Sequence, residues 1–385
     1  MNDRDKIRFD KYLEKVSEFL NNYKGQMPFA VFLKDCFRNN PQMGGRDRRE
    51  VSKLCWQLFR IGHWKKELPL KQRLIMAARQ RPEENGDLLE TLDLSGEAFS
   101  SPDPVEIFPF IGSLSAKVEP AAYVESFKKQ PDLFLRLRPG KEDAIQQKLS
   151  NAGIGFAIEN AHCLRLPNLS AADRILDLDR EAVVQDLNSQ HTGTIVAEYV
   201  HRFLSDQKIH LWDCCAGSGG KTILLHDLLS PASIVVSDSR YGILQNLKQR
   251  IRQAGVPVND LQQLDLSKRV PAKILPGFNV IFADMPCSGS GTWARTPEEM
   301  AFFTEKKIMQ YAGLQLRIAK NTLPFLAPGG LFVYVTCSVF AAENELNFHE
   351  IIHRSGMQQL EMKLLEGYNN SSDSLFIGIA RHGTS

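Results

Sequence analysis

The chain has 385 residues, of which 43% are hydrophobic, and its 47 Lys and Arg against 45 Asp and Glu give a formal net charge of +2. These are ordinary globular values, so they exclude a largely disordered chain and a fibrous protein. The length leaves room for two or three domains of roughly 100 to 200 residues each.

The N-terminal residues 1–10 lack the apolar core of a signal peptide, and no apolar run in the sequence is long enough to cross a bilayer. We therefore expect a cytoplasmic, monomeric protein without membrane partners. The 7 cysteines make an odd number and include no Cys-x-x-Cys pair. This pattern argues against a disulfide framework and against a zinc site, so we expect reduced thiols and no metal.

Residues 1–95 show apolar residues at helical spacing, for example from Val51 through Leu54 and Leu58 to Phe59. We predict a small helical domain. The segment 34–66 within it carries a local excess of basic residues. They could form a surface that faces phosphates, or they could belong to an ordinary solvated helix face. The basic residues are Lys34, Arg38, Arg46, Arg48, Arg49, Lys53, Arg60, Lys65 and Lys66.

Residues 96–120 are rich in Ser, Pro and Gly, which break both the helical and the strand period, and we predict a linker there. The following segment, 121–185, contains a strand-like run at 133–138 and a helical stretch at 141–152. Short strand-like runs follow at 155–158 and 163–166. We predict a small α+β module.

Residues 186–385 alternate apolar strand candidates with helical segments. Such a rhythm predicts an α/β domain built on a parallel, doubly wound sheet. The expected strands are 209–214, 233–238, 261–265, 279–284 and 331–336.

A glycine-rich turn follows the first of these strands and reads Cys215-Ala216-Gly217-Ser218-Gly219-Gly220-Lys221. A P-loop would require glycine at position 215, and a dinucleotide fingerprint would require glycine at position 222. These positions are Cys215 and Thr222, so both patterns fail. The remaining interpretation is a loop that cradles the methionine part of S-adenosylmethionine.

That interpretation requires polar groups at the ends of the next strands. A carboxylate can accept two hydrogen bonds from the ribose diol, and Asp238 ends the second strand. Asp265 ends the third predicted strand, where it could meet the adenine amine. A single Asp at a strand end is often a helix cap, but acids in register along the sheet favour a cofactor site.

Two cysteines follow the last two predicted strands. Cys287 stands in Asp284-Met285-Pro286-Cys287-Ser288-Gly289-Ser290-Gly291, and Cys337 stands in Thr336-Cys337-Ser338. Ligands of open parallel sheets bind beyond the carboxyl ends of the strands, so we expect both thiols beside the cofactor. Carbon 5 of a pyrimidine becomes nucleophilic when a thiolate adds to carbon 6, which is the chemistry that a cysteine supplies.

On these motifs, residues 182–381 resemble the RsmB/NOP (Sun/Fmu-type) family of RNA (cytosine-5)-methyltransferases. The family pattern Asp-x-Pro-Cys-Ser-Gly-x-Gly with a downstream Arg-x-Pro is met over residues 284–297, and Thr-Cys-Ser is met at 336–338. The resemblance implies a Rossmann-like class I S-adenosylmethionine-dependent methyltransferase domain, preceded by a small α+β module and an N-terminal helical domain that is similar to NusB.

The resemblance also implies a role for each site residue. Cys337 would add to carbon 6 of cytosine, Cys287 would assist release of the product, and Asp284 would contact the base edge. The substrate would be RNA, with ribosomal RNA preferred over transfer RNA. The cofactor-binding residues would be Cys215, Ala216, Gly217, Ser218, Gly219, Gly220, Lys221, Asp238, Asp265 and Asp284.

The chain departs from the family at two places. Gly217-Ser218 replaces the usual Ala-Pro, which frees the backbone of the loop, and Ala294 stands where an arginine pair is common.

Two other classes of protein remain as alternatives. A DNA (cytosine-5)-methyltransferase would use Cys287 as its nucleophile, and a non-catalytic RNA-binding scaffold would use neither thiol.

Overall fold

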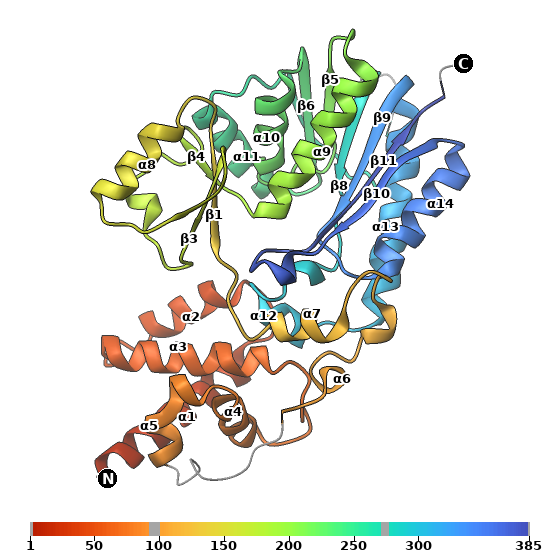
Figure 1. Cartoon of the computed structure of the whole chain (residues 1–385). Helices are drawn as coiled ribbons and strands as arrows, with labels where there is room; N and C mark the ends of the chain where they lie inside the picture. The colour runs from red at the N-terminus through yellow and green to blue at the C-terminus, as the bar shows by residue number, and fades with distance from the viewer. Residues whose placement is uncertain (1–2, 92–100, 271–276, 384–385) are drawn as a thin grey trace. The chain divides into compact units, whose positions relative to one another are not determined.

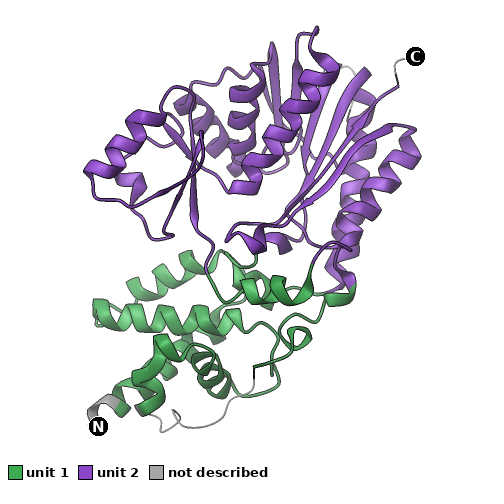
Figure 2. Cartoon of the chain, viewed as in Figure 1, with its two compact units in different colours: residues 1–112, 119–129, 293–304 green, residues 113–118, 130–292, 305–385 purple. Residues whose placement is uncertain are grey.

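The computed structural model describes residues 3–91, 101–270 and 277–383 and is drawn in Figure 1. The chain divides into two compact units, which Figure 2 distinguishes by colour. Unit 1 comprises residues 1–112, 119–129 and 293–304, and unit 2 comprises residues 113–118, 130–292 and 305–385. Within the described ranges, no helix is both long enough and apolar enough to cross a membrane.

Unit 1 is helical, as the periodicity of its sequence predicts. The face of α3 that carries Val51, Leu54, Leu58 and Phe59 is buried, which is the face expected from the spacing of these residues. Its core is aromatic, with the ring of Phe29 lying 4.8 Å from the ring of Phe59. The helices are α1 (Asp3–Asn22), α2 (Phe29–Arg38), α3 (Gly45–Arg60), α4 (Leu70–Arg79), α5 (Pro82–Thr91), α6 (Pro104–Ile107), α7 (Pro120–Ser126) and α12 (Pro297–Ala301).

The segment 96–120, predicted to be a linker, is partly structured. Residues 92–100 lie outside the described residues, but α6 and the short 3-10 helix η1 (Ile111–Ser113) follow. A capping box formed by Asp103 and Glu106, with Pro104 in the first turn, starts α6. Unit 1 also includes residues 119–129, so the two compact units are divided differently from the predicted domains. The domain boundaries at residues 95, 120 and 185 stay predictions.

A four-stranded antiparallel sheet with the order β2-β3-β1-β4 opens unit 2. Helix α8 (Glu142–Asn151) buries Ile145 and Leu149 against Leu135, Leu137 and Leu164 of this sheet. The strand predicted at 155–158 corresponds to β2, which begins two residues later. Its pairing with β3 starts at Ala157, and Gly155 and Phe156 do not take part in it. The strands are β1 (Leu133–Leu137), β2 (Ala157–Asn160), β3 (Cys163–Leu166) and β4 (Ala182–Val184).

The larger sheet has the order β10-β11-β9-β8-β5-β6-β7. Strands β5 to β9 are parallel, as predicted, whereas β11 pairs antiparallel with both β9 and β10. The sheet is therefore mixed at one edge, although the predicted doubly wound core is confirmed. The strands are β5 (His210–Asp213), β6 (Ser233–Asp238), β7 (Asp260–Gln263), β8 (Phe278–Asp284), β9 (Leu326–Thr336), β10 (Gln358–Leu365) and β11 (Leu375–Arg381).

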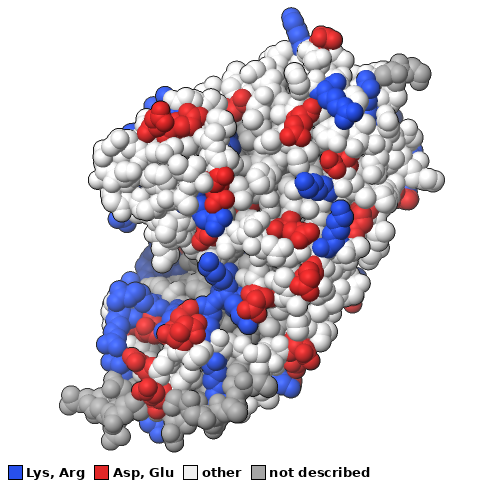
Figure 3. Space-filling view, in the orientation of Figure 1, with Lys and Arg blue, Asp and Glu red and all other residues white. Residues whose placement is uncertain are grey.

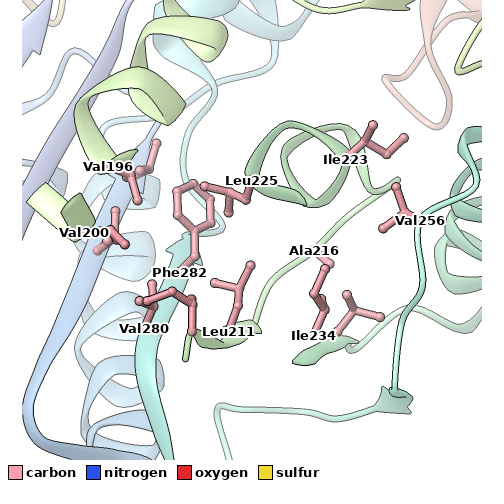
Figure 4. Close-up of a cluster of buried hydrophobic side chains, with 14 of the residues drawn as sticks. Val196, Val200, Leu211, Ala216, Ile223, Leu225, Ile234, Val256, Val280 and Phe282 are labelled. Carbon is pink, nitrogen blue, oxygen red and sulfur yellow. The ribbon is translucent and has the colours of Figure 1, made fainter. Parts of the chain in front are cut away.

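Helices cover both faces of this sheet. Val196 and Val200 of α9 pack with Ile223 and Leu225 of α10 over one face, as Figure 4 shows. On the other face, the ring of Tyr334 lies 5.8 Å from a ring of α14. The helices are α9 (Leu187–Leu204), α10 (Gly220–Leu229), α11 (Tyr241–Ala254), α13 (Lys306–Thr322) and α14 (Glu345–Ser355).

Candidate active site

The two cysteines singled out by the sequence meet at the carboxyl ends of β8 and β9. These strands are parallel neighbours, with Asp284 in register with Val335. Cys287 and Cys337 lie on the loops that follow, and their Sγ atoms are 3.2 Å apart, within hydrogen-bond distance for sulfur. The structure thus brings together residues that are 50 positions apart in the sequence.

Backbone hydrogen bonds hold the two loops together. The N–H of Met285 donates to the carbonyl of Val335 at 2.8 Å, and the N–H of Gly291 donates to the carbonyl of Cys337 at 2.9 Å. A Cβ atom at position 291 would lie 2.0 Å from the carbonyl oxygen of Ser374. Glycine is therefore the only residue type that fits there without moving the backbone, which accounts for the second glycine of the Cys287 motif.

A buried carboxylate fixes the loop that carries Cys287. Glu343 accepts hydrogen bonds from the N–H of Ser288 at 2.8 Å and from Nε2 of Gln315 at 3.3 Å. Gln315 also donates to the carbonyl of Pro286 at 3.0 Å, so the backbone is held on both sides of the cysteine. Burial raises the pKa of Glu343. Sequence analysis did not identify Glu343 or Gln315, since no local pattern marks either residue.

A cavity of about 500 Å³ opens beside the two thiols. Of the predicted site residues, seven line it, and they come from the carboxyl ends of five strands of the sheet. They are Cys215, Gly217, Asp238, Asp265, Asp284, Cys287 and Cys337. Five predicted residues, Ala216, Ser218, Gly219, Gly220 and Lys221, are not part of its lining and belong to the body of the glycine-rich turn and to α10.

Sequence analysis missed several residues that line the cavity. Tyr311, Leu314 and Ile318 come from α13, where their spacing of three and four residues is a helical signal that could have been used. The others follow strand ends or the cysteine motif. They are Cys214, Ser239, Arg240, Leu264, Leu266, Ser267, Met285 and Pro286.

The glycine-rich turn is tied to Asp238. The N–H of Gly217 donates to Oδ2 of Asp238 at 3.0 Å, and Gly217 has φ +54°, a value that residues with a side chain rarely adopt. Nε and Nη2 of Arg240 each lie 3.0 Å from the same carboxylate. Burial acts to raise the pKa of Asp238, but these hydrogen bonds outweigh it, so the pKa is lowered and the group is ionised.

Lys221 connects the turn to the cysteine loops, because its Nζ donates to Oδ2 of Asp284 at 2.7 Å. Burial acts to lower the pKa of Lys221, but the charge of Asp284 and the hydrogen bond to it, together with other nearby groups, outweigh burial and raise the pKa. The ammonium group therefore stays charged. The pKa of Cys287 is raised well above its ordinary value, first by its hydrogen bond to Cys337 and then by burial.

Asp265 differs from the prediction in its local structure. Strand β7 ends at Gln263, so Asp265 lies in the turn beyond it rather than at the strand end. Its Oδ1 accepts hydrogen bonds from the N–H of Ser267 at 3.1 Å and from the hydroxyl of Ser267 at 2.6 Å. These bonds lower the pKa of Asp265. The residue still lines the cavity, but its carboxylate is engaged by its own turn.

The cavity is suited in shape and chemistry to S-adenosylmethionine. Leu264, Leu266 and Ile318 supply apolar walls for a flat base, and Asp238 supplies an ionised carboxylate for a diol. The open space around the Cα of Gly217 lets a ligand approach the backbone. Among the described residues, no group of three or more His, Cys, Asp or Glu side chains is arranged to hold a metal ion.

The chain was compared with protein families and with curated proteins. Residues 202–375 match the family model described as 16S rRNA methyltransferase RsmB/F. The probable ribosomal RNA small subunit methyltransferase B of Synechocystis is 28% identical over 320 residues, which cover 79% of this chain and 69% of that protein. The ribosomal RNA small subunit methyltransferase B of Enterobacter is 30% identical over 241 residues, 61% of this chain and 54% of that protein. The chain thus spans little more than half the length of the Enterobacter relative.

Solved structures were compared as well. NSun6 from Pyrococcus horikoshii, solved with SFG, superposes with a TM-score of 0.60 at 16% identity, and the match covers 72% of this chain and 97% of that one. At this identity the likeness shows the fold. The predicted Rossmann-like methyltransferase fold is therefore confirmed, and S-adenosylmethionine is confirmed as the cofactor of the family. Residues 202–375 of this chain are thus similar to the RsmB/F family of methyltransferases, as the motifs of the sequence predict.

Proposed function

We propose that this protein methylates carbon 5 of cytosine in RNA, with Cys337 as the nucleophile and ribosomal RNA as the preferred substrate. The observation that carries the proposal is the pair of thiols 3.2 Å apart at the rim of a cavity of about 500 Å³. A methyltransferase that acts on oxygen or nitrogen needs no such pair. The names of the curated relatives, which are small-subunit ribosomal RNA methyltransferases, support the choice of RNA.

Different residues around the cavity would bind different parts of the cofactor. Asp238 would accept the ribose hydroxyls, with Arg240 turning outward from the carboxylate that it now contacts. Arg240 can move in this way because its side chain is 64% exposed. The backbone of Gly217 would lie against the methionine part, and Leu264 and Ile318 would enclose the adenine. When bound, S-adenosylmethionine supplies an electrophilic methyl group.

Cys337 is the better placed of the two thiols for attack. A thiolate, not a thiol, adds to carbon 6, and a nearby ammonium favours the thiolate. The raised pKa of Cys287 keeps that residue protonated, so Cys287 serves as a hydrogen-bond partner of Cys337 and not as the nucleophile. Addition forms the bond from sulfur to carbon 6 and makes carbon 5 nucleophilic.

Release reverses the addition after carbon 5 has been methylated. A base removes the hydrogen from carbon 5, and the bond from carbon 6 to sulfur breaks and returns its electron pair to Cys337. We propose that Cys287 takes part in this step, because its sulfur lies 3.2 Å from the sulfur of Cys337. Asp284, held by Lys221, faces the same cavity and would contact the amino edge of the base.

The basic segment 34–66 of unit 1 is proposed to bind the RNA backbone. Figure 3 shows Lys and Arg side chains gathered over α2 and α3, with some acidic side chains among them. Arg46 and Arg49 are exposed, whereas Arg48 donates from Nε to the carbonyl of Met43 at 2.9 Å. Exposed arginines can contact phosphates with little cost in lost internal bonds.

Replacing Arg46 and Arg49 together by alanine is expected to weaken RNA binding in a salt-dependent way. Each lost phosphate contact should reduce the slope of log affinity against log salt by roughly 0.7 to 0.9. The slope can be measured by fluorescence anisotropy with a labelled RNA at several salt concentrations. Lys11→Ala, which removes a charge from the exposed face of α1, is the control. An unaltered slope in the double variant would identify segment 34–66 as an ordinary solvated face.

The whole proposal is tested by methyl transfer from a labelled cofactor. We expect label in ribosomal RNA transcripts, located at carbon 5 of cytosine by nucleoside analysis, and none in DNA of the same sequence. Label in transfer RNA alone would change the substrate, and label in DNA would favour Cys287 as nucleophile. Binding of RNA without any transfer, in the presence of bound cofactor, would favour the non-catalytic scaffold.

A further inference from the structure

An arginine of α11, Arg250, contacts the glycine-rich turn. Nη1 of Arg250 donates to the hydroxyl oxygen of Ser218 at 2.9 Å and to the carbonyl oxygen of Ser218 at 3.2 Å. The side chain of Arg250 is 26% exposed as a whole, although its hydrogen bonds to Ser218 lie at the surface. Ser218 is one of the two residues at which the turn lacks the family's Ala-Pro, and sequence analysis gave neither residue a partner.

The same guanidinium is held by Asp179, a residue of the chain segment that leads into β4. Nε of Arg250 lies 2.9 Å from Oδ2 of Asp179, and Nη2 lies 2.7 Å from Oδ1. This is a two-point contact between a planar guanidinium and a carboxylate, which fixes the orientation of the arginine as well as its position. One face of Arg250 is thus anchored, and the remaining nitrogen points at the turn.

Asp179 is itself rigidly placed. Its N–H donates to the carbonyl of Ala182 at 2.7 Å, and its own carbonyl accepts from Nη1 of Arg138 at 2.7 Å. The residue has φ +67°, which asparagine and aspartate tolerate better than other residues with a side chain. A conformation of this kind persists when the surrounding contacts impose it. The side chain is 12% exposed, so the ion pair is largely buried on the aspartate side.

The turn needs an external support of this kind. Gly217 has φ +54°, and a Cβ built on it would meet no atom within 4 Å, so side-chain packing does not restrict it. Glycine has the largest conformational freedom to lose on ordering. The N–H of Gly217 is tied to Asp238, which is the carboxylate proposed to receive the ribose. Movement of the turn therefore changes the geometry of the cofactor site.

We propose that Arg250, oriented by Asp179, is a positioning residue that holds the glycine-rich turn in the conformation that binds the methyl donor. The inference rests on the proposed function, because it assigns the turn to the cofactor. The inference adds that the affinity for the cofactor depends on Asp179, which lies in the small antiparallel module, 71 positions away from Arg250 in the sequence. Arg250 does not touch the reacting atoms, and its effect is exerted through the preorganisation of Ser218 and Gly217.

The test is calorimetric binding of S-adenosylhomocysteine, a stable product, to the full-length chain. Arg250→Met should weaken binding by about tenfold, which corresponds to about 1.4 kcal/mol. Asp179→Asn should weaken it by a smaller factor, because asparagine keeps the shape and the backbone conformation but loses the charge that orients the arginine. Arg252→Met is the matched control, since Arg252 is exposed on the same helix two residues further along.

A variant that leaves the ion pair intact protects the test against misfolding. Ser218→Ala removes only the hydroxyl acceptor, so it should weaken binding by about threefold, and it should add nothing in the background of Arg250→Met. This non-additivity is the signature of two residues that act through one contact. In steady-state assays with RNA, the KM for the methyl donor should rise while kcat at saturating cofactor stays within about twofold, because the turn positions a ligand and does not perform the chemistry.

Wild-type affinity in Arg250→Met, or additive losses in the double variant, would overturn the inference. A uniform loss of kcat with unchanged KM would do the same, because it would show a damaged fold rather than a misplaced turn. Failure of the unchanged protein to bind the product would reject the cofactor assignment of the proposed function, and the inference with it.

Discussion

Replacing Cys337 by alanine is expected to abolish methylation and every covalent complex with RNA. Cys337 lines the cavity and is the proposed nucleophile, and without it no other group in the cavity is proposed to add to carbon 6. Loss of a covalent nucleophile lowers turnover by about four orders of magnitude or more. The loss is measured as label transferred to RNA per enzyme, and as the absence of a slower band in denaturing electrophoresis.

Replacing Cys287 by alanine should have a different result, because release is a separate step from attack. The variant keeps Cys337, so addition and methylation proceed once. Release is slowed, since the neighbour at 3.2 Å that could assist it is gone. We therefore expect a covalent protein–RNA complex with ordinary cytosine RNA, at a level that the unchanged protein does not reach.

RNA that contains 5-fluorocytosine supplies the positive control. Fluorine at carbon 5 cannot leave as a proton, so the complex is trapped even in the unchanged protein. Cys36→Ala removes a thiol of α2, far from the motif in sequence, and should behave as the unchanged protein does. A complex that persists in Cys337→Ala and vanishes in Cys287→Ala would exchange the two roles and support the arrangement expected for a DNA methyltransferase.

The parts of this fold that could be predicted are those with a local signal. The parallel strands β5, β6 and β8 are apolar runs followed by turns, and they were located to within one residue of their bounds. Strand β9 was located at its carboxyl end, and that end fixes the position of Cys337. The edge strand β10 was missed. Its residues are mostly exposed or half-buried, which leaves it without the continuous apolar run of a central strand.

The parts of the candidate site that could not be predicted depend on contacts between distant residues. Glu343 supports the Cys287 loop across 55 positions, and Asp179 orients Arg250 across 71. Neither pair has a sequence period or motif, because the register of the sheet and the packing of its helices bring the partners together. The cysteines were found because the chemistry of their motif is unusual, whereas a supporting carboxylate looks like any other acidic residue in the sequence.

Replacing Asp238 by alanine should weaken binding of the methyl donor by about 10- to 100-fold. The estimate follows from hydrogen bonds to an ionised carboxylate, which contribute roughly 1.5 to 3 kcal/mol. The structure adds a second reason for a large effect. Asp238 also accepts from the N–H of Gly217 at 3.0 Å, so its loss frees the turn as well as removing the proposed ribose contact.

Asp238→Asn separates these two contributions. Asparagine keeps an oxygen that can accept from Gly217, but it loses the charge and one of the two acceptor oxygens, so its loss of affinity should lie between that of alanine and zero. Calorimetry with S-adenosylhomocysteine measures both variants, and Asp206→Ala, at an exposed position after α9, controls for a change of net charge. Equal and large losses in alanine and asparagine would mean that the charge, and hence the diol contact, dominates. Unchanged affinity in both would remove Asp238 from the cofactor site and would leave the cavity beside Cys337 in need of another occupant.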